Sequence, residues 1–184
     1  MTRKGGLDSR QLRWLVAQDP HLRNRFLGVF AADELPLLQD VPRPSGLIVN
    51  SDPSHKPGTH WMAIYYGKDG QDEFFDSYGK SPTSYVRAWQ NHLNPGYEYS
   101  SKILQGDDTT VCGHYCVFYL KQKSLGRTLK EVTDRFPGPK SANDRKICHW
   151  VCRNPHLLKR HKAREFCQSS VCGREGTRRR LNCE

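Results

Sequence analysis

The chain has 184 residues, of which 36% are hydrophobic and 26% are charged, and these values fit one domain with a packed core and a very polar surface. The formal net charge is +10, from 29 Lys and Arg against 19 Asp and Glu. This excess favours a polyanionic partner, usually nucleic acid, with solubility alone as the other explanation. Because no stretch approaches the ~18 apolar residues of a membrane span, we expect no membrane association.

The cysteines indicate the redox environment. Their number, seven, is odd, and residues 1–6 contain no apolar signal segment, which argues against a secreted disulfide scaffold. We therefore expect the protein to work in a reducing compartment, the cytosol or nucleus, and not to be secreted. The cysteines are Cys112, Cys116, Cys148, Cys152, Cys167, Cys172 and Cys183.

The first elements expected along the chain are a helix and two short apolar segments. Residues 1–7 are predicted to form a flexible lead. A helix follows, because Asp8 or Ser9 can cap it and apolar residues then recur at helical spacing. Those apolar residues are Leu12, Leu15 and Val16. After a short apolar stretch over 26–30, residues 47–49 predict a buried strand.

The middle of the chain predicts a β-hairpin. Residues 60–66 and 73–76 both have strand patterns, and the turn signal Lys68-Asp69-Gly70 lies between them. Residues 85–93 have a helical pattern, whereas the alternation over 97–104 predicts a third strand of the same sheet.

The second half predicts three helices. A polar loop over 105–111 leads into an apolar run over 115–120, which indicates a buried helix with Cys112 in its first turn. Two further helical patterns cover 129–136 and 142–153.

Together these elements predict an α+β domain with a central mixed sheet packed against helices. The domain is expected to span residues 8–154. Residues 155–184 then form a basic, cysteine-rich tail, with basic runs at 159–164 and 178–180.

Three residues from separate elements are candidate catalytic groups. Cys112 stands at a helix start, where unpaired amides and the helix dipole favour a thiolate over a thiol. His60 opens one strand of the hairpin and Asp76 closes the other, so we expect them within a few Å of each other. The carboxylate would fix the imidazole tautomer, and the other ring nitrogen would face the thiol, an arrangement for acyl transfer. A hydrogen-bonded histidine without a chemical role is the alternative.

Gln105 is a candidate for stabilising a reaction intermediate. It lies seven residues before Cys112, and its side-chain amide, with the backbone N–H of Cys112, could bind the oxyanion of a tetrahedral intermediate. Plain solvation is the alternative for an isolated loop glutamine. Asp108 is a weaker candidate for orienting His60.

These residues resemble a known family. The chain is similar to the adenovirus-type cysteine endopeptidase, as found in adenoviruses, related viruses and self-synthesising DNA transposons, and more distantly to the ubiquitin-like-protein-specific proteases. The similarity covers roughly residues 26–122. It consists of His60-Trp61-Met62-Ala63, Phe75-Asp76-Ser77-Tyr78-Gly79, and Gln105-Gly106 followed by Cys112-Gly113 at the family's spacing.

The resemblance implies a papain-like fold and a role for each residue. The catalytic Cys would be Cys112, at the N-terminus of the buried helix, with His60 as general base. Asp76 would orient the imidazole, and Gln105 would donate to the oxyanion. Trp61 would line a narrow substrate groove together with Gly113.

The resemblance also implies a biological setting. It implies a thiol protease that cleaves viral or transposon precursor proteins at small-residue, Gly-Gly-like sites during virion maturation, in the host nucleus and the virion, with DNA as a stimulating partner. Gly5-Gly6 would be a candidate autoprocessing site, with a flexible lead as the alternative. The adenoviral enzyme has Glu where this chain has Asp76. No Cys before Gln105 could tether an activating peptide, which leaves peptide activation open.

Two other functions stay open. One is an isopeptidase of the deubiquitinase or deSUMOylase type, and the other is an inactive DNA-binding protein with a protease fold. No cofactor is expected for the chemistry. Zinc is not favoured, because the spacing of the late Cys and His residues matches no common zinc signature. Those residues are Cys148, His149, Cys152, His156, His161, Cys167 and Cys172.

Overall fold

The computed structural model describes residues 6–84, 87–154 and 157. Its centre is a five-stranded mixed sheet in the order β1-β2-β3-β4-β5, which confirms the predicted α+β class. The outer pairs β1–β2 and β4–β5 are parallel, and the inner pairs β2–β3 and β3–β4 are antiparallel. The strands are β1 (Phe26–Phe30), β2 (Ser45–Asn50), β3 (Trp61–Tyr66), β4 (Asp72–Phe75) and β5 (Glu98–Tyr99).

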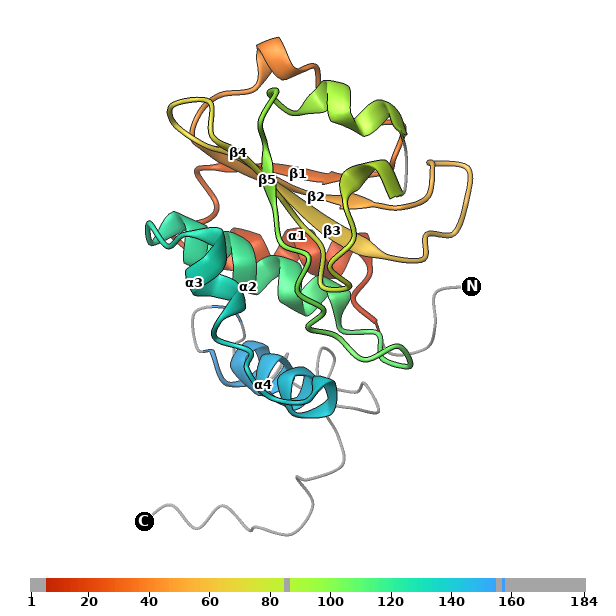
Figure 1. Cartoon of the computed structure of the whole chain (residues 1–184), viewed down its shortest axis with the longest axis vertical. Coiled ribbons are helices and arrows are strands. Elements are labelled where there is room, and N and C mark those ends of the chain that lie inside the picture. The colour runs from red at the N-terminus through yellow and green to blue at the C-terminus, as the bar shows by residue number, and fades with distance from the viewer. Residues whose placement is uncertain (1–5, 85–86, 155–156, 158–184) are drawn as a thin grey trace, which may run out of the picture.

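The helices and the short 3-10 segments cover opposite faces of this sheet. Figure 1 shows α1 to α4 gathered on one side and the 3-10 turns η1 to η3 on the other. The α-helices are α1 (Ser9–Gln18), α2 (Cys112–Ser124), α3 (Leu129–Thr133) and α4 (Lys140–Arg153). The 3-10 segments are η1 (Leu38–Asp40), η2 (Pro82–Ser84) and η3 (Arg87–His92). Within the described ranges, none of the helices is long and apolar enough to cross a bilayer.

The two faces bury two separate hydrophobic cores, because successive strand residues point to opposite sides. In β3, Ala63 and Tyr65 face the core shared with the α-helices. Met62 and Ile64 face the second core, which Trp89 of η3 closes. A strand covered on both faces explains the nearly continuous apolar sequence of 61–66.

The helix that begins at Cys112 lies in the middle of the larger core. Most of its residues are buried, Tyr115 and Tyr119 completely. A helix that is apolar on all sides is typical of such a position. The helix ends at Ser124, shortly before Gly126, whose φ of 79° is a conformation that residues with side chains rarely adopt.

The predicted N-terminal helix is confirmed as α1. Asp8 accepts a hydrogen bond from the Gln11 amide, while the Gln11 side chain accepts one from the Asp8 amide, which together make a capping box. Residues 1–5 of the predicted lead lie outside the described residues. Leu7 is buried in the helix-side core, so this end of the predicted lead is packed against the domain.

Two expectations differ from the structure. The helical pattern over 85–93 corresponds to the 3-10 segment η3, in a region where residues 85 and 86 are not described. The strand predicted over 97–104 is reduced to β5, which pairs with β4 through two residues only. The remainder, 100–104, has no regular structure, because its backbone instead leads toward the loop before α2.

Candidate active site

The β3–β4 hairpin brings His60 and Asp76 together. Their flanking strands pair with Ala63 opposite Phe75, so the residue before β3 and the residue after β4 meet at the same end of the hairpin. His60 Nε2 lies 2.6 Å from Asp76 Oδ1. The sequence predicted that His60 is the first residue of one strand and Asp76 the last residue of the other. In the structure His60 instead comes directly before β3 and Asp76 directly after β4.

The Asp76 carboxylate is fixed by the turn that follows it. Its Oδ1 accepts a hydrogen bond from the Tyr78 amide at 2.9 Å and its Oδ2 accepts one from the Lys80 amide at 3.1 Å. Gly79 permits this turn, since its φ is 69° and a Cβ there would lie 2.5 Å from the Ser101 carbonyl oxygen. The carboxylate is therefore held in place before it meets the imidazole.

His60 also contacts Tyr78 and Cys112. The Tyr78 ring stacks on the imidazole with ring centres 4.6 Å apart. Because Asp76 occupies Nε2, the ring nitrogen that remains for the hydrogen bond with the Cys112 side chain is Nδ1. The structure thus brings the predicted histidine, carboxylate and thiol into one chain of contacts.

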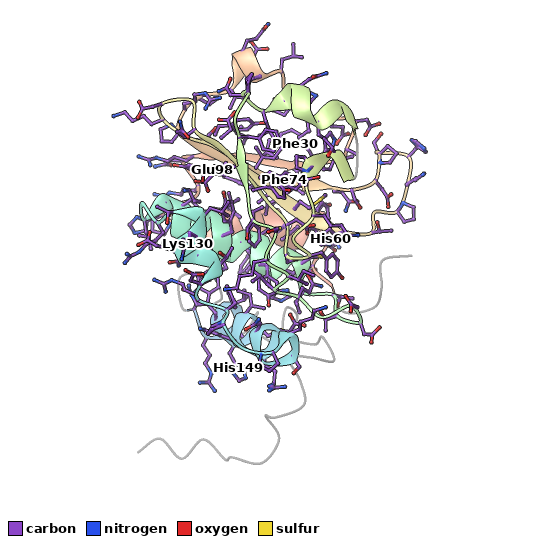
Figure 2. All side chains as sticks on the ribbon, in the orientation of Figure 1. Phe30, His60, Phe74, Glu98, Lys130 and His149 are labelled. Atoms are coloured by element: carbon purple, nitrogen blue, oxygen red, sulfur yellow. The ribbon has the colours of Figure 1, made fainter. Side chains whose placement is uncertain are left out.

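The surroundings favour the protonated imidazole. Burial lowers the pKa of His60, but the hydrogen bonds with Asp76 and Cys112 and the charges of both groups outweigh it, and the pKa rises to about 9. An imidazolium that persists near neutral pH can pair with a thiolate. Figure 2 shows the His60 side chain beside the sheet, on the side of the view away from Lys130.

A cleft of about 590 Å³ opens over this cluster. His60 and Cys112 line it although both residues are mostly buried. Trp61 lines it too, as expected for a groove residue, and its indole Nε1 donates to the Leu7 carbonyl at 2.8 Å. Gly113 is placed differently, because it is buried against Leu7 and Leu12.

Gln105 lies beneath the cleft. It is fully buried and, among the described residues, is not one that lines the cleft. Its Oε1 accepts a hydrogen bond from Ser77 at 2.7 Å, while its Nε2 donates to the Thr109 carbonyl at 2.9 Å and to the Tyr78 hydroxyl at 3.4 Å. The amide is therefore held in one orientation, with its donor side toward Tyr78, a residue of the cleft wall.

Two other sequence candidates have different outcomes. Asp108, the alternative orienting group, is exposed, and Asp76 holds the imidazole. Cys148 and Cys152 belong to a chain for which a reducing compartment was expected, but both are disulfide-bonded.

Only some of the candidate zinc ligands lie among the described residues. Across residues 6–84, 87–154 and 157, no three His, Cys, Asp or Glu side chains are grouped as a metal would require. The remaining zinc candidates lie outside the described residues, namely His156, His161, Cys167 and Cys172.

The sequence analysis missed the residues that support the site. Tyr78 and Ser77 were noted only as part of a segment, yet one stacks on His60 and the other orients Gln105. The signal was present in the sequence, because a turn directly after an orienting carboxylate must supply the amides that hold it. Asp144 of α4, which bonds the loop before α2, had no local signal.

The chain is similar in sequence to a viral cysteine protease. No protein-family model matches it. It is 30% identical over 112 residues to the cysteine protease S273R of African swine fever virus, isolate Tick/Malawi/Lil 20-1/1983. The match covers 52% of this chain, and the chain spans only 41% of that protein's length.

A similar solved structure is the crystal structure of the selenomethionine form of the African swine fever virus pS273R protease. It shares 18% sequence identity and a TM-score of 0.46, with 85% of this chain and 69% of that chain covered.

Proposed function

We propose that the chain is a cysteine endopeptidase. The observation that supports this most directly is the contact chain from Asp76 through His60 to Cys112, with 2.6 Å between the first two groups. The cleft above it gives a peptide access to the sulfur. The similarity to a viral cysteine protease supports the same reaction class.

The proposed reaction begins with the sulfur. The Cys112 thiolate attacks the scissile carbonyl carbon, a C–S bond forms, and the carbonyl oxygen becomes an oxyanion. The Cys112 backbone N–H, at the start of α2, stabilises that oxyanion. The buried Gln105 Nε2 adds a second donor by giving up its 3.4 Å contact with the Tyr78 hydroxyl on the cleft wall. His60, as imidazolium, gives its proton to the leaving nitrogen while the C–N bond breaks.

Hydrolysis of the acyl-enzyme completes the cycle. His60, now neutral, takes a proton from water, whose oxygen attacks the thioester carbon. The C–S bond then breaks, which releases the carboxylic acid and restores the thiolate–imidazolium pair. Asp76 keeps its hydrogen bond to Nε2 throughout, so the imidazole does not change its orientation between the two proton transfers.

The substrates and setting belong to the same proposal. We propose cleavage of viral or transposon precursor proteins at small-residue, Gly-Gly-like sites during particle maturation, in the host nucleus and the virion, with DNA as a stimulating partner. Trp61 and Leu7 line the cleft together with Cys112, and the Leu7 carbonyl fixes the Trp61 indole. We propose that these two residues limit the size of the substrate side chains next to the sulfur.

The test uses two cysteines of the same helix. Cys112→Ala and His60→Ala should each abolish cleavage of Gly-Gly-containing peptides, measured by mass spectrometry with and without DNA. Cys116→Ala is the matched control, because Cys116 is a buried free cysteine one turn further along α2, and it should retain turnover. Full activity in Cys112→Ala would reject the proposal, and cleavage of ubiquitin-type conjugates without any peptide cleavage would replace it by an isopeptidase.

A further inference from the structure

Helix α4 holds the loop that contains Gln105. Asp144, in the first half of this helix, accepts a hydrogen bond from the Gly106 amide at 3.0 Å and one from the Thr109 hydroxyl at 2.9 Å, both on its Oδ2. Its Oδ1 accepts from the Tyr115 hydroxyl at 3.0 Å. One carboxylate therefore links α4 to α2 and to both ends of the segment 106–109.

Asn143, the residue before Asp144, binds the backbone on the other side of Gln105. Asn143 donates through its Nδ2 to the Leu104 carbonyl at 3.3 Å and to the Gly138 carbonyl at 3.0 Å. Both Asn143 and Asp144 are buried. Two consecutive α4 side chains thus fix the backbone immediately before and immediately after Gln105.

The packing at Gly106 shows how close this contact is. A Cβ at that position would lie 3.0 Å from Asp144 Oδ2, tighter than ordinary van der Waals contact allows. The glycine therefore lets its own amide approach the carboxylate. Burial raises the pKa of Asp144, while the bonds from Gly106, Thr109 and Tyr115 oppose that rise, so these donors are what a carboxylate in this position requires.

The contacts lead directly to the Gln105 amide. Thr109 gives its hydroxyl to Asp144 and accepts Gln105 Nε2 on its own carbonyl at 2.9 Å. If Thr109 shifts, the acceptor that orients Gln105 shifts with it. The β3–β4 hairpin and its turn hold His60 and Asp76, and the route from Asp144 reaches His60 through a weaker contact. That contact is the 3.4 Å one between Gln105 Nε2 and the hydroxyl of Tyr78, whose ring stacks on the imidazole.

We propose that Asp144 is a positioning residue of the oxyanion site. Its carboxylate holds Gly106 and Thr109, and through Thr109 it sets the orientation of the Gln105 amide. This inference rests on the proposed function, because it assigns Asp144 to the stabilisation of the tetrahedral intermediate and not to the nucleophile.

The experiment compares two partners of the same carboxylate. Thr109→Val removes the hydroxyl that donates to Asp144 Oδ2 and that also lies 3.0 Å from the Gly106 carbonyl, on the Gln105 side. Tyr115→Phe removes the hydroxyl that donates to Asp144 Oδ1 and that also lies 3.3 Å from the Leu104 carbonyl, but it leaves the Thr109 contact in place. We expect Thr109→Val to lower kcat about tenfold, as expected when an oxyanion donor worth about 100- to 1000-fold is displaced and not removed. Its KM should stay unchanged. Tyr115→Phe should lower thermal stability with little change in kcat.

Asp144→Asn is the direct variant, and it should lower kcat more than Thr109→Val does. If it fails to fold, Thr109→Val still tests the inference. The rate at which iodoacetamide alkylates Cys112 is the second measurement, because it reports the nucleophile alone. We expect this rate to be the same in wild type, Thr109→Val and folded Asp144→Asn.

The outcomes separate this inference from the proposed function. Suppose that the wild type cleaves peptide. If Thr109→Val then has the same kcat as Tyr115→Phe, Asp144 has only a structural role and the inference is rejected. The inference is also rejected if the alkylation of Cys112 in Thr109→Val slows in parallel with kcat. If the wild type cleaves no peptide and no conjugate, the proposed function is rejected, and the inference is rejected with it.

Discussion

His60 carries out the proton transfers of the proposed reaction. Its side chain is 8% exposed and the Asp76 side chain is 0% exposed, so water contributes little to the charge of either group. Removing a charge from water is costly unless a partner compensates it. Here the carboxylate, two backbone amides and the thiol provide that compensation, and the imidazolium is the favoured state.

Replacing Asp76 by Asn should therefore change the pH dependence of the reaction. The proton of His60 is needed for the leaving group, so wild-type kcat should fall as the pH rises through about 9, the pKa of His60. In Asp76→Asn burial still lowers that pKa while the carboxylate no longer raises it, so this alkaline limb should move to lower pH and activity at pH 7 should fall at least about tenfold. A pH–rate profile measures both effects.

The same pKa predicts a stability change with a defined sign. The folded-state pKa of His60 lies above the ordinary value of 6.5, so the stability gained from protonated His60 is complete below about pH 6.5 and is lost as the pH rises through about 9. Urea denaturation from pH 6 to 9.5 should show this loss, and Asp76→Asn should reduce it. If the alkaline limb of the pH–rate profile lies at the same pH in Asp76→Asn and in wild type, Asp76 is not the group that raises the pKa of His60.

At the scale of elements, α2 joins the nucleophile to the sheet. Its first residue is Cys112, and the helix packs against β3. On the β4 side, Lys123 Nζ lies 2.6 Å from Glu73 Oε1, and the Tyr119 hydroxyl donates to Glu73 Oε2 at 2.8 Å. Glu73 stands three residues before Asp76, so this buried pair helps to fix the helix relative to the strand that ends at the orienting carboxylate.

The buried pair predicts a non-additive stability effect. Lys123→Met leaves the Glu73 charge without its cation, and Glu73→Gln leaves the ammonium without its anion, so each should lower the free energy of unfolding by about 3–5 kcal/mol. The double variant removes both charges and still offers an acceptor to Tyr119, so it should be far more stable than the sum predicts. Urea denaturation of the four proteins gives the coupling. Additive losses would show that the pair is not coupled.

The elements also show what the sequence could and could not predict. α1 was predictable from its capping residue Asp8 and the helical spacing of its apolar residues, and α2 was predictable from its apolar run alone, since its N-cap Val111 makes no side-chain cap. His60, Asp76 and Cys112 were predictable because a hairpin and a helix start place them locally. The role of Asp144 was not, since its partner Gly106 lies 38 residues away and no periodicity indicates such a contact.

The short β5 has a similar explanation. The alternation over 97–104 is real, but after Tyr99 the backbone leaves β4, and the amides of Leu104 and Gln105 instead donate to the Ser77 carbonyl. A pattern of alternation does not reveal that a competing partner exists. These bonds hold Gln105 beside Ser77, whose hydroxyl also orients the Gln105 side chain.

At the scale of the whole molecule, the net charge of +10 remains the main indication of a partner. Several exposed basic side chains of the described domain lie in ion pairs with Asp or Glu, among them Arg127, Lys130 and Lys140. The basic runs at 159–164 and 178–180 belong to the tail predicted over 155–184. We therefore propose the tail as the main source of affinity for DNA.

This proposal predicts a salt-dependent affinity that depends on the tail. Replacing Arg178, Arg179 and Arg180 by Ala should weaken DNA binding and make the slope of log K against log salt shallower by up to about 3, since each phosphate contact contributes about 0.9. Replacing Arg127, Lys130 and Lys140 by Ala removes the same number of charges from ion pairs and should change the slope less. Fluorescence anisotropy with duplex DNA at about 50 to 200 mM salt measures both slopes. Over this range of salt, six to ten phosphate contacts change the affinity about 10³- to 10⁵-fold. Equal slopes in the two variants would show that the arginines of the tail do not contact DNA. A wild-type affinity that does not change with salt would reject an electrostatic interaction with DNA.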